Sequence, residues 1–238
     1  MKLKNEIGTY SHYLLKNEKA RISMSLRNDV NYMLSQNQDE KFTGAVYISE
    51  FICPKTDFSY FEKIKEELKD NEILQWSRHF KIDNPTNSLT FNSLIHILSL
   101  RFNMEIYVSR LNYYPNGLSW KPFHQDSHAF DLNGEKKEDI TIGISLGYSR
   151  NLSFKHIETG EIFNFPQNNG DIFAFDKIVN QKFYHGVPST SENVGPRISI
   201  IVWGKRKEEF EINETKKIDK ERKINPLKYK LKNKNIVQ

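Results

Sequence analysis

Residues 140–176 read ITIGISLGYSRNLSFKHIETGEIFNFPQNNGDIFAFD. Short runs of β-branched and aromatic residues occupy 140–147, 151–157, 161–165 and 171–176. Two of the breaks between these runs are turn sequences of the kind that joins neighbouring strands in hairpins, namely Glu158-Thr159-Gly160 and Asn168-Asn169-Gly170. The stretch therefore predicts consecutive antiparallel strands rather than strands that alternate with helices.

The pattern extends in both directions from this stretch. Further strands are expected at 105–114, 182–185 and 196–203, and an earlier one within Ala45–Phe51. Two amphipathic helices precede most of these strands, and their apolar faces consist of Phe61, Ile64 and Leu68 in the first and of Phe91, Leu94, Ile95 and Leu98 in the second. Seven or eight short strands after two helices predict a mainly β, α+β fold. We expect a double-stranded β-helix, or jelly roll, with two packed N-terminal helices.

Charge is distributed unevenly along the chain. The formal net charge is +5, yet from Lys205 onward there are 12 Lys and Arg against 6 Asp and Glu, which leaves 23 against 24 in the first 204 residues. We therefore divide the chain into a polar, irregular or partly helical leader at 1–41, one domain at 42–206 and a basic tail at 207–238. The tail is either a solvated end or an electrostatic arm for phosphate backbones.

The composition limits the class of protein. The 238 residues are 37% hydrophobic and 27% charged, and no apolar run reaches the roughly 18 residues that a membrane span needs. The first 30 residues lack the apolar segment of a secretion signal. Cys53 is the single cysteine, so no intrachain disulfide can form. We expect an intracellular monomer, in the cytoplasm or nucleus, that binds no membrane.

The segment Trp120-Lys121-Pro122-Phe123-His124-Gln125-Asp126 places a histidine and a carboxylate two residues apart. In an extended strand both side chains project from the same face and can share one metal ion. His185 lies 59 residues after Asp126 and is the candidate for a third ligand, with a surface histidine as the alternative interpretation. Two imidazoles and one carboxylate form the ligand set of many non-haem iron sites, which leaves three adjacent coordination positions open.

Arg197 begins a β-prone run 12 residues after His185. If a chelating keto acid occupied two positions on the iron, its distal carboxylate would need a fixed cation. A guanidinium group suits this role because it donates two parallel hydrogen bonds to a carboxylate. Arg197 is the candidate for that cation, and a salt bridge at the end of a strand is the alternative.

As a set, these residues resemble the AlkB-like branch of the iron(II)- and 2-oxoglutarate-dependent dioxygenases over roughly residues 43–206. The matching segments follow the family's order: Asn112-Tyr113-Tyr114-Pro115-Asn116-Gly117, His124-Gln125-Asp126, Ser145-Leu146-Gly147, Asn169-Gly170-Asp171, Phe183-Tyr184-His185-Gly186 and Arg197-Ile198-Ser199. The resemblance implies that His124, Asp126 and His185 hold Fe(II), with 2-oxoglutarate and dioxygen as co-substrates.

The resemblance also implies roles for residues around the keto acid. Asn112 and Tyr114 would contact the carboxylates of 2-oxoglutarate beside Arg197, and Ser199 stands where the family usually has Asn or Ser. One position departs from the pattern: the family commonly carries a second arginine six residues after the first, and this chain has Trp203 there.

For the substrate, the resemblance implies oxidative demethylation of alkylated bases in single-stranded DNA or RNA. Flipped or unpaired bases stack on aromatic side chains, so Trp76 and Trp120 are candidates for substrate contact. His128 continues the face of Asp126 and is a third candidate, while core packing or simple exposure is the alternative for each. Two other functions stay open: the same chemistry on a protein side chain or small molecule, and a catalytically silent jelly-roll binding module.

Overall fold

The computed structural model describes residues 24–34, 43–70, 74–126 and 138–207, which form two β-sheets and four helices. The six-stranded sheet has the order β1-β8-β5-β10-β3-β2 and comprises β1 (Ala45–Ile48), β2 (Phe80–Asp83), β3 (Met104–Tyr114), β5 (Ile140–Gly147), β8 (Ile172–Asp176) and β10 (Arg197–Arg206). The four-stranded sheet has the order β4-β9-β6-β7 and comprises β4 (Lys121–His124), β6 (Arg150–His156), β7 (Ile162–Gln167) and β9 (Phe183–Val187).

The chain crosses repeatedly between the two sheets. From β3 to β10 each strand joins the sheet opposite to its predecessor, except that β6 and β7 form a hairpin within one sheet. Strand β5 pairs antiparallel with β8 and β10, and β9 pairs antiparallel with β4 and β6. This connectivity is that of a jelly roll, so the predicted mainly β fold is confirmed.

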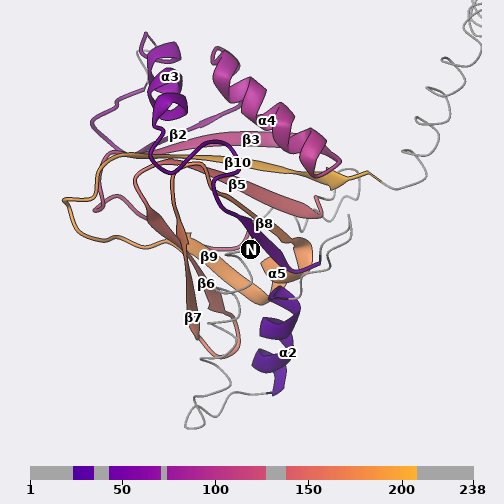
Figure 1. Ribbon diagram of the computed structural model, residues 1–238. Coiled ribbons are helices and arrows are strands. Elements are labelled where there is room, and N and C mark those ends of the chain that lie inside the picture. Colours follow the sequence, from indigo (N-terminus) through magenta and orange to yellow (C-terminus); the bar gives the residue numbers. More distant parts are fainter. Residues whose placement is uncertain (1–23, 35–42, 71–73, 127–137, 208–238) are drawn as a thin grey trace, which may run out of the picture. The chain divides into compact units, whose positions relative to one another are not determined.

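Both predicted helices are present and cover one face of the six-stranded sheet. Helix α3 (Ser59–Glu67) and helix α4 (Leu89–Arg101) lie on the same side of this sheet, as Figure 1 shows. Helix α4 begins after Ser88, whose hydroxyl oxygen accepts a hydrogen bond from the Phe91 N–H at 3.0 Å. None of the described helices is long and apolar enough to cross a membrane.

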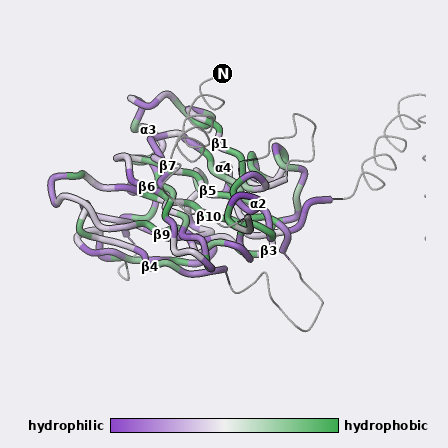
Figure 2. Tube along the Cα trace, turned by 90° about the horizontal axis from the view of Figure 1, so that it is seen from below, coloured by the Kyte–Doolittle hydropathy of each residue, from purple (hydrophilic) through white to green (hydrophobic). Residues whose placement is uncertain are grey.

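The residues between the helices and the sheet form what we call the helix-side core. It includes Phe61, Ile64, Leu94 and Leu98 from the helices and Ile142, Ile144, Ile198 and Ile200 from the sheet. Figure 2 shows hydrophobic stretches along the central strands that supply this core. Because side chains alternate along a strand, the residues between these isoleucines must face the other sheet.

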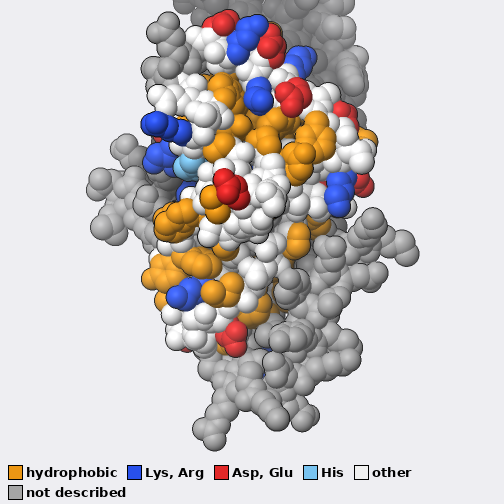
Figure 3. Space-filling view, turned by 90° about the vertical axis from the view of Figure 1, so that its left-hand side faces the viewer, with side chains coloured by type: hydrophobic (Ala, Val, Ile, Leu, Met, Phe, Trp, Pro, Cys, Tyr) orange, Lys and Arg blue, Asp and Glu red, His pale blue; other side chains and the backbone are white. Residues whose placement is uncertain are grey.

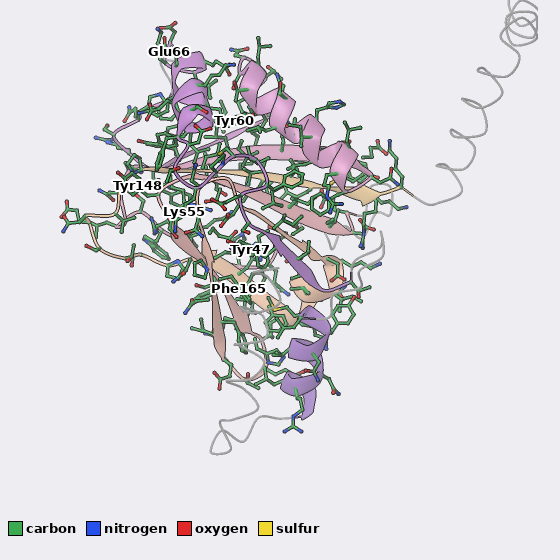
Figure 4. The ribbon with its side chains drawn as sticks, viewed as in Figure 1. Tyr47, Lys55, Tyr60, Glu66, Tyr148 and Phe165 are labelled. Carbon is green, nitrogen blue, oxygen red and sulfur yellow. The ribbon has the colours of Figure 1, made fainter. Side chains whose placement is uncertain are left out.

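A second, aromatic core lies between the sheets. Phe154 is fully buried there, with the rings of Phe165, Phe173, Phe175 and Phe183 around it. Tyr47 and Phe165, labelled in Figure 4, belong to the same core. One residue of the candidate site, His185, packs against this core through Phe154 and Phe175.

Residues 24–33, which the sequence assigned to the polar leader, form helix α2 (Met24–Met33) and belong to the packed fold. Leu26, Val30 and Met33 are buried in the inter-sheet core. The expected start near residue 42 therefore leaves out one helix that the core includes. A short helix α5 (Lys177–Lys182), which the sequence did not predict, joins β8 to β9. Residues 1–23 and the basic tail from 208 onward lie outside the described part of the chain.

Gly170 provides a test of the predicted turn after β7. Its φ is +81°, and an added Cβ would lie 2.1 Å from the carbonyl oxygen of Cys53. We expect Gly170→Ala to lower the free energy of unfolding by at least about 3 kcal/mol, because backbone strain and a backbone collision combine. Chemical denaturation measures the change. Gly160→Ala is the matched control, since φ is +73° there but the nearest atom is 3.7 Å away. Equal losses in the two variants would show that the collision is unimportant.

Candidate metal and co-substrate site

The predicted site residues of β10 share the inner face of the six-stranded sheet. Ile198, Ile200 and Val202 point into the helix-side core. The alternate residues Arg197, Ser199 and Trp203 therefore face the four-stranded sheet. The strand register places Ser199 opposite Ser145 and Trp203 opposite Thr141, so β5 extends the same polar face.

The same alternation separates the candidates on and near β3. Tyr113 belongs to the helix-side core, so its neighbours Asn112 and Tyr114 face inward. Trp76 packs against Tyr113 with ring centroids 4.8 Å apart, and therefore lies on the helix-covered face. The sequence-based suggestion that Trp76 stacks on substrate does not fit this position, because the sheet separates it from the inner face.

Three predicted metal ligands come together at the end of the jelly roll. His124 ends β4 and is paired in register with His185 of β9, and their ring centroids are 4.4 Å apart. Asp126 Oδ1 lies 3.7 Å from His124 Nε2 and 3.5 Å from His185 Nε2. One ligand atom from each residue lies within 4.8 Å of the others. These separations approach the roughly 3.0–3.4 Å between neighbouring donors around an ion with bonds of about 2.1 Å.

The donor atoms fit a first-row metal ion. His124 Nδ1 lies 2.9 Å from the carbonyl oxygen of Pro122, so it carries the proton and leaves the Nε2 lone pair facing the other ligands. His185 differs, because its Nδ1 is buried with no hydrogen-bond partner among the described residues. The ring of His185 is instead held among aromatic side chains, with centroids 5.0 Å from Phe175 and 6.0 Å from Phe154. Two imidazoles and one carboxylate suit iron(II).

The surroundings keep Asp126 and His124 in the protonation states that metal binding needs. Burial opposes the ionisation of Asp126, but the neighbouring His185 and Trp203 side chains outweigh it and hold the carboxyl pKa below its usual value. Burial, with the charges of His185 and Lys121, lowers the pKa of His124 from 6.5 to about 4. An anionic carboxylate beside a neutral imidazole is therefore the state near neutral pH.

The lowered pKa of His124 predicts a pH-dependent stability in the metal-free protein. As the pH falls from 6.5 to 4.5, the unfolded chain takes up a proton at this histidine and the folded chain does not, so the free energy of unfolding should decrease. We expect a contribution on the order of 2 kcal/mol, reduced from the full shift because the side chain is 28% exposed. Chemical denaturation at both pH values measures it. His124→Gln should lose less stability over this range, and an equal loss would contradict the assignment.

Two cavities meet at the candidate metal ligands. A narrow inner cavity of about 50 Å³ runs between the sheets and is lined by Tyr114, Lys121, His124, His185, Arg197 and Ser199 with apolar residues such as Leu152, Phe173 and Ile201. A wider outer cavity of about 550 Å³ is lined by His79, Lys81, Arg110, Asn112, Trp120, Lys121, His124, Asp126 and Trp203. His124 and Lys121 line both, so the metal ligands lie where the two cavities adjoin.

Arg197 is the buried cation of the inner cavity. Its Nε donates a hydrogen bond to Ser145 Oγ at 2.8 Å, while its Nη1 is buried without a partner in the part of the chain that the structure describes. Burial lowers the pKa of Arg197 to about 10, so the group stays charged near neutral pH. No carboxylate is present among the described residues that line this cavity. An unpaired buried guanidinium nitrogen costs free energy, which a carboxylate ligand would recover.

The other expected co-substrate residues divide between the cavities. Tyr114 and Ser199 line the inner cavity with Arg197, and the guanidinium Cζ lies 5.5 Å from the centroid of the Tyr114 ring. Asn112 lines the outer cavity instead, and its Nδ2 is buried without a partner among the described residues. The structure thus places Tyr114 and Ser199, but not Asn112, beside Arg197.

The remaining substrate candidates have different positions. Trp120 is 58% exposed and lines the outer cavity next to His124. His128 lies in 127–137, outside the described residues. Figure 3 shows one face of the molecule, on which hydrophobic side chains gather in patches with lysines and arginines close by.

Three residues of the site were not singled out from the sequence. Thr141 donates a hydrogen bond to Asp126, Asn180 bonds the Asp126 backbone, and Lys121 lines both cavities. Alternation along 140–147 could have indicated Thr141, because it shares a face with Ser145. No sequence signal marked Asn180.

Comparisons with known proteins show a distant relationship. No family model matches the chain. It is 29% identical over 117 residues to an uncharacterized protein of Acanthamoeba polyphaga mimivirus, an alignment that covers 49% of this chain and 56% of the other. The chain thus spans about half the length of the curated relative that it matches.

Two solved structures share parts of the arrangement. A prolyl-4-hydroxylase of Pseudomonas putida is 15% identical in sequence to this chain, with a TM-score of 0.47. The match covers 69% of this chain and 94% of the hydroxylase chain. A viral collagen prolyl hydroxylase from Paramecium Bursaria Chlorella virus-1, in complex with 2-oxoglutarate, is 13% identical, with a TM-score of 0.48. That match covers 69% of this chain and 96% of the viral chain.

Proposed function

We propose that this protein is an iron(II)- and 2-oxoglutarate-dependent dioxygenase. The observation that carries the proposal is the inner cavity, which combines two imidazoles of the metal triad, apolar walls and the incompletely paired guanidinium group of Arg197. A slender dicarboxylate that chelates a metal at one end and needs a cation at the other matches this arrangement of metal ligands, apolar walls and a buried guanidinium group. 2-Oxoglutarate is such a molecule.

Each group of the chain then has a role. His124, Asp126 and His185 would hold iron(II), which with 2-oxoglutarate and dioxygen supplies the oxidation of a substrate C–H bond and yields succinate and carbon dioxide. Arg197 would bind the distal carboxylate. The apolar walls and the rings around His185 surround the cavity with little polar surface, so that charged contacts inside it are strengthened.

The test of this proposal is succinate formation by the purified protein from 2-oxoglutarate, with iron and dioxygen, in the absence of another substrate. Slow iron-dependent turnover is expected, because such enzymes decompose the keto acid without substrate. A catalytically silent binding module would bind 2-oxoglutarate and form no succinate. Absence of both binding and turnover would refute the co-substrate assignment.

For the substrate, we propose an alkylated base in single-stranded DNA or RNA, in line with the AlkB-like resemblance. The outer cavity supports this choice, because the exposed ring of Trp120 offers a stacking surface and Lys81, Arg110 and Lys121 offer positive charge. Arg110 is partly neutralised, since its Nη2 lies 3.1 Å from Asp83 Oδ2. On an N-methyl group, hydroxylation would give a hemiaminal that loses formaldehyde.

The alternative substrate is a protein side chain or small molecule. Mass spectrometry of methylated oligonucleotides, methylated peptides and free metabolites separates the possibilities, because demethylation removes the mass of one methylene group. Exclusive loss of mass from oligonucleotides would support the nucleic-acid proposal, and loss only from peptides or metabolites would replace it.

The basic tail gives a separate prediction for a nucleic-acid substrate. Removal of the residues after Lys223 deletes Lys228, Lys230, Lys232 and Lys234. We expect weaker binding of single-stranded oligonucleotides of any sequence, and a salt dependence flatter by about 0.7 log units per lost phosphate contact. Fluorescence anisotropy at several salt concentrations measures both. If the truncated and full-length proteins bind alike, the tail is only a solvated end.

A further inference from the structure

The two carboxylate oxygens of Asp126 have different partners. Oδ1 is the oxygen that lies 3.7 Å from His124 Nε2 and 3.5 Å from His185 Nε2. Oδ2 accepts a hydrogen bond from the hydroxyl group of Thr141 at 3.0 Å. The Asp126 side chain is only 6% exposed, so water does not compete freely for these contacts. Only Oδ1 is therefore directed at the metal position.

The backbone of Asp126 is fastened as well. Its N–H donates to Asn180 Oδ1 at 3.0 Å, and Asn180 Nδ2 donates back to the Asp126 carbonyl oxygen at 3.1 Å. Asn180 is 2% exposed. Gln125 Nε2 adds a hydrogen bond to the Asn180 carbonyl oxygen at 2.7 Å. The backbone N–H and the carbonyl oxygen of Asp126 are thus both hydrogen-bonded to one residue of helix α5.

Helix α5 connects this anchor to the third ligand. It ends at Lys182, and β9 begins at the next residue and carries His185. Asn180 therefore ties the segment with His124 and Asp126 to the segment with His185, in addition to the pairing of β4 with β9. Thr141 ties the same carboxylate to the six-stranded sheet, so both sheets contribute to its position.

We propose that Thr141 and Asn180 are positioning residues that hold Asp126 as a one-oxygen metal ligand. This inference rests on the metal site of the proposed function. A carboxylate already fixed in direction loses less conformational freedom when a metal binds, and partners of metal ligands commonly account for 10–100-fold in metal affinity. A neutral hydroxyl donor also leaves the full negative charge of Asp126 available to the metal.

The test measures binding of Co(II) alone to the metal-free, full-length protein, by visible absorption and by competition with a chelator. Thr141→Val keeps the side-chain shape and removes the hydroxyl group, and we expect it to raise the Kd for Co(II) 10–100-fold and to alter the Co(II) spectrum. Thr141→Ser should restore the Kd to within about threefold of the wild-type value. Asn180→Ala should weaken binding by a factor similar to that of Thr141→Val.

Thr90→Val is the matched control, because it removes another buried threonine hydroxyl, bonded to Glu67 Oε1 at 2.7 Å, far from the metal ligands in the fold. It should leave the Kd for Co(II) unchanged. If Thr141→Val does not fold, Thr141→Ser and Thr141→Ala make the same comparison, with the alanine variant expected to bind at least tenfold more weakly than the serine variant. Unchanged affinity in the Thr141 and Asn180 variants would overturn this inference alone. A wild-type protein that binds no Co(II) would overturn the metal site and the inference together.

Discussion

The Asp126→Ala protein is expected to bind iron(II) at least about 100-fold more weakly than wild type and to form no succinate above the iron-free background. A lost ligand should cost more than a lost partner of a ligand, which accounts for 10–100-fold. Asp126 is also the only anion of the candidate triad, so its removal leaves two neutral donors for a dication. His124→Ala and His185→Ala should also abolish turnover, because each removes one of the three metal ligands. Iron titration and succinate analysis measure the two effects.

Two comparisons separate a lost metal from a lost fold. Asp126→Asn preserves the size of the side chain and can still accept the Thr141 hydrogen bond, yet it removes the charge, so weak metal binding with a preserved melting temperature is expected. His79→Ala removes a histidine that lines the outer cavity but is outside the triad, and should still bind iron. Substantial turnover by any of the three ligand variants would refute the triad.

Arg197→Ala should raise the apparent KM for 2-oxoglutarate by roughly 10- to 150-fold. Hydrogen bonds to charged groups contribute about 1.5–3 kcal/mol, and each 1.4 kcal/mol is a factor of ten. The variant should also discriminate less against keto acids without a distal carboxylate, because that is the group that Arg197 would recognise. Initial rates over a range of concentrations of both kinds of keto acid measure the effect.

Arg150 provides the matched control for Arg197. It is also a buried arginine, but its guanidinium donates to the backbone carbonyl oxygens of Asn116, Ser119 and Pro188 and does not line the inner cavity. Arg150→Ala should therefore reduce stability without a comparable rise in KM in the protein that remains folded. An unchanged KM in Arg197→Ala would remove Arg197 from the co-substrate role.

Much of the architecture could be predicted because the signals are local. The period of two in 140–147 and 196–203 and the helical period of about 3.6 in Phe91, Leu94 and Leu98 depend only on neighbouring residues, and β5, β10 and α4 appear where these patterns lie. Helix α2 was not expected as part of the fold, because its short apolar face becomes meaningful only when Leu26 and Val30 meet the inter-sheet core.

The candidate site shows the same division. The sequence by itself determined which residue types were available for metal and carboxylate binding, since the spacing of His124 and Asp126 and the start of a strand at Arg197 are features of one segment each. Their roles stay predictions until metal and co-substrate binding are measured.

Only the tertiary structure decided which residues meet. The register of β4 with β9 brings His124 to His185. One step along β3 separates Tyr113, which lies in the helix-side core with Trp76 packed against it, from Asn112, which lines the outer cavity. Helix α5 brings Asn180 to Asp126 across 54 positions of sequence. Hydrogen bonds and burial between distant segments depend on the strand register and on how the two sheets pack. No local pattern of residues determines which distant segments meet.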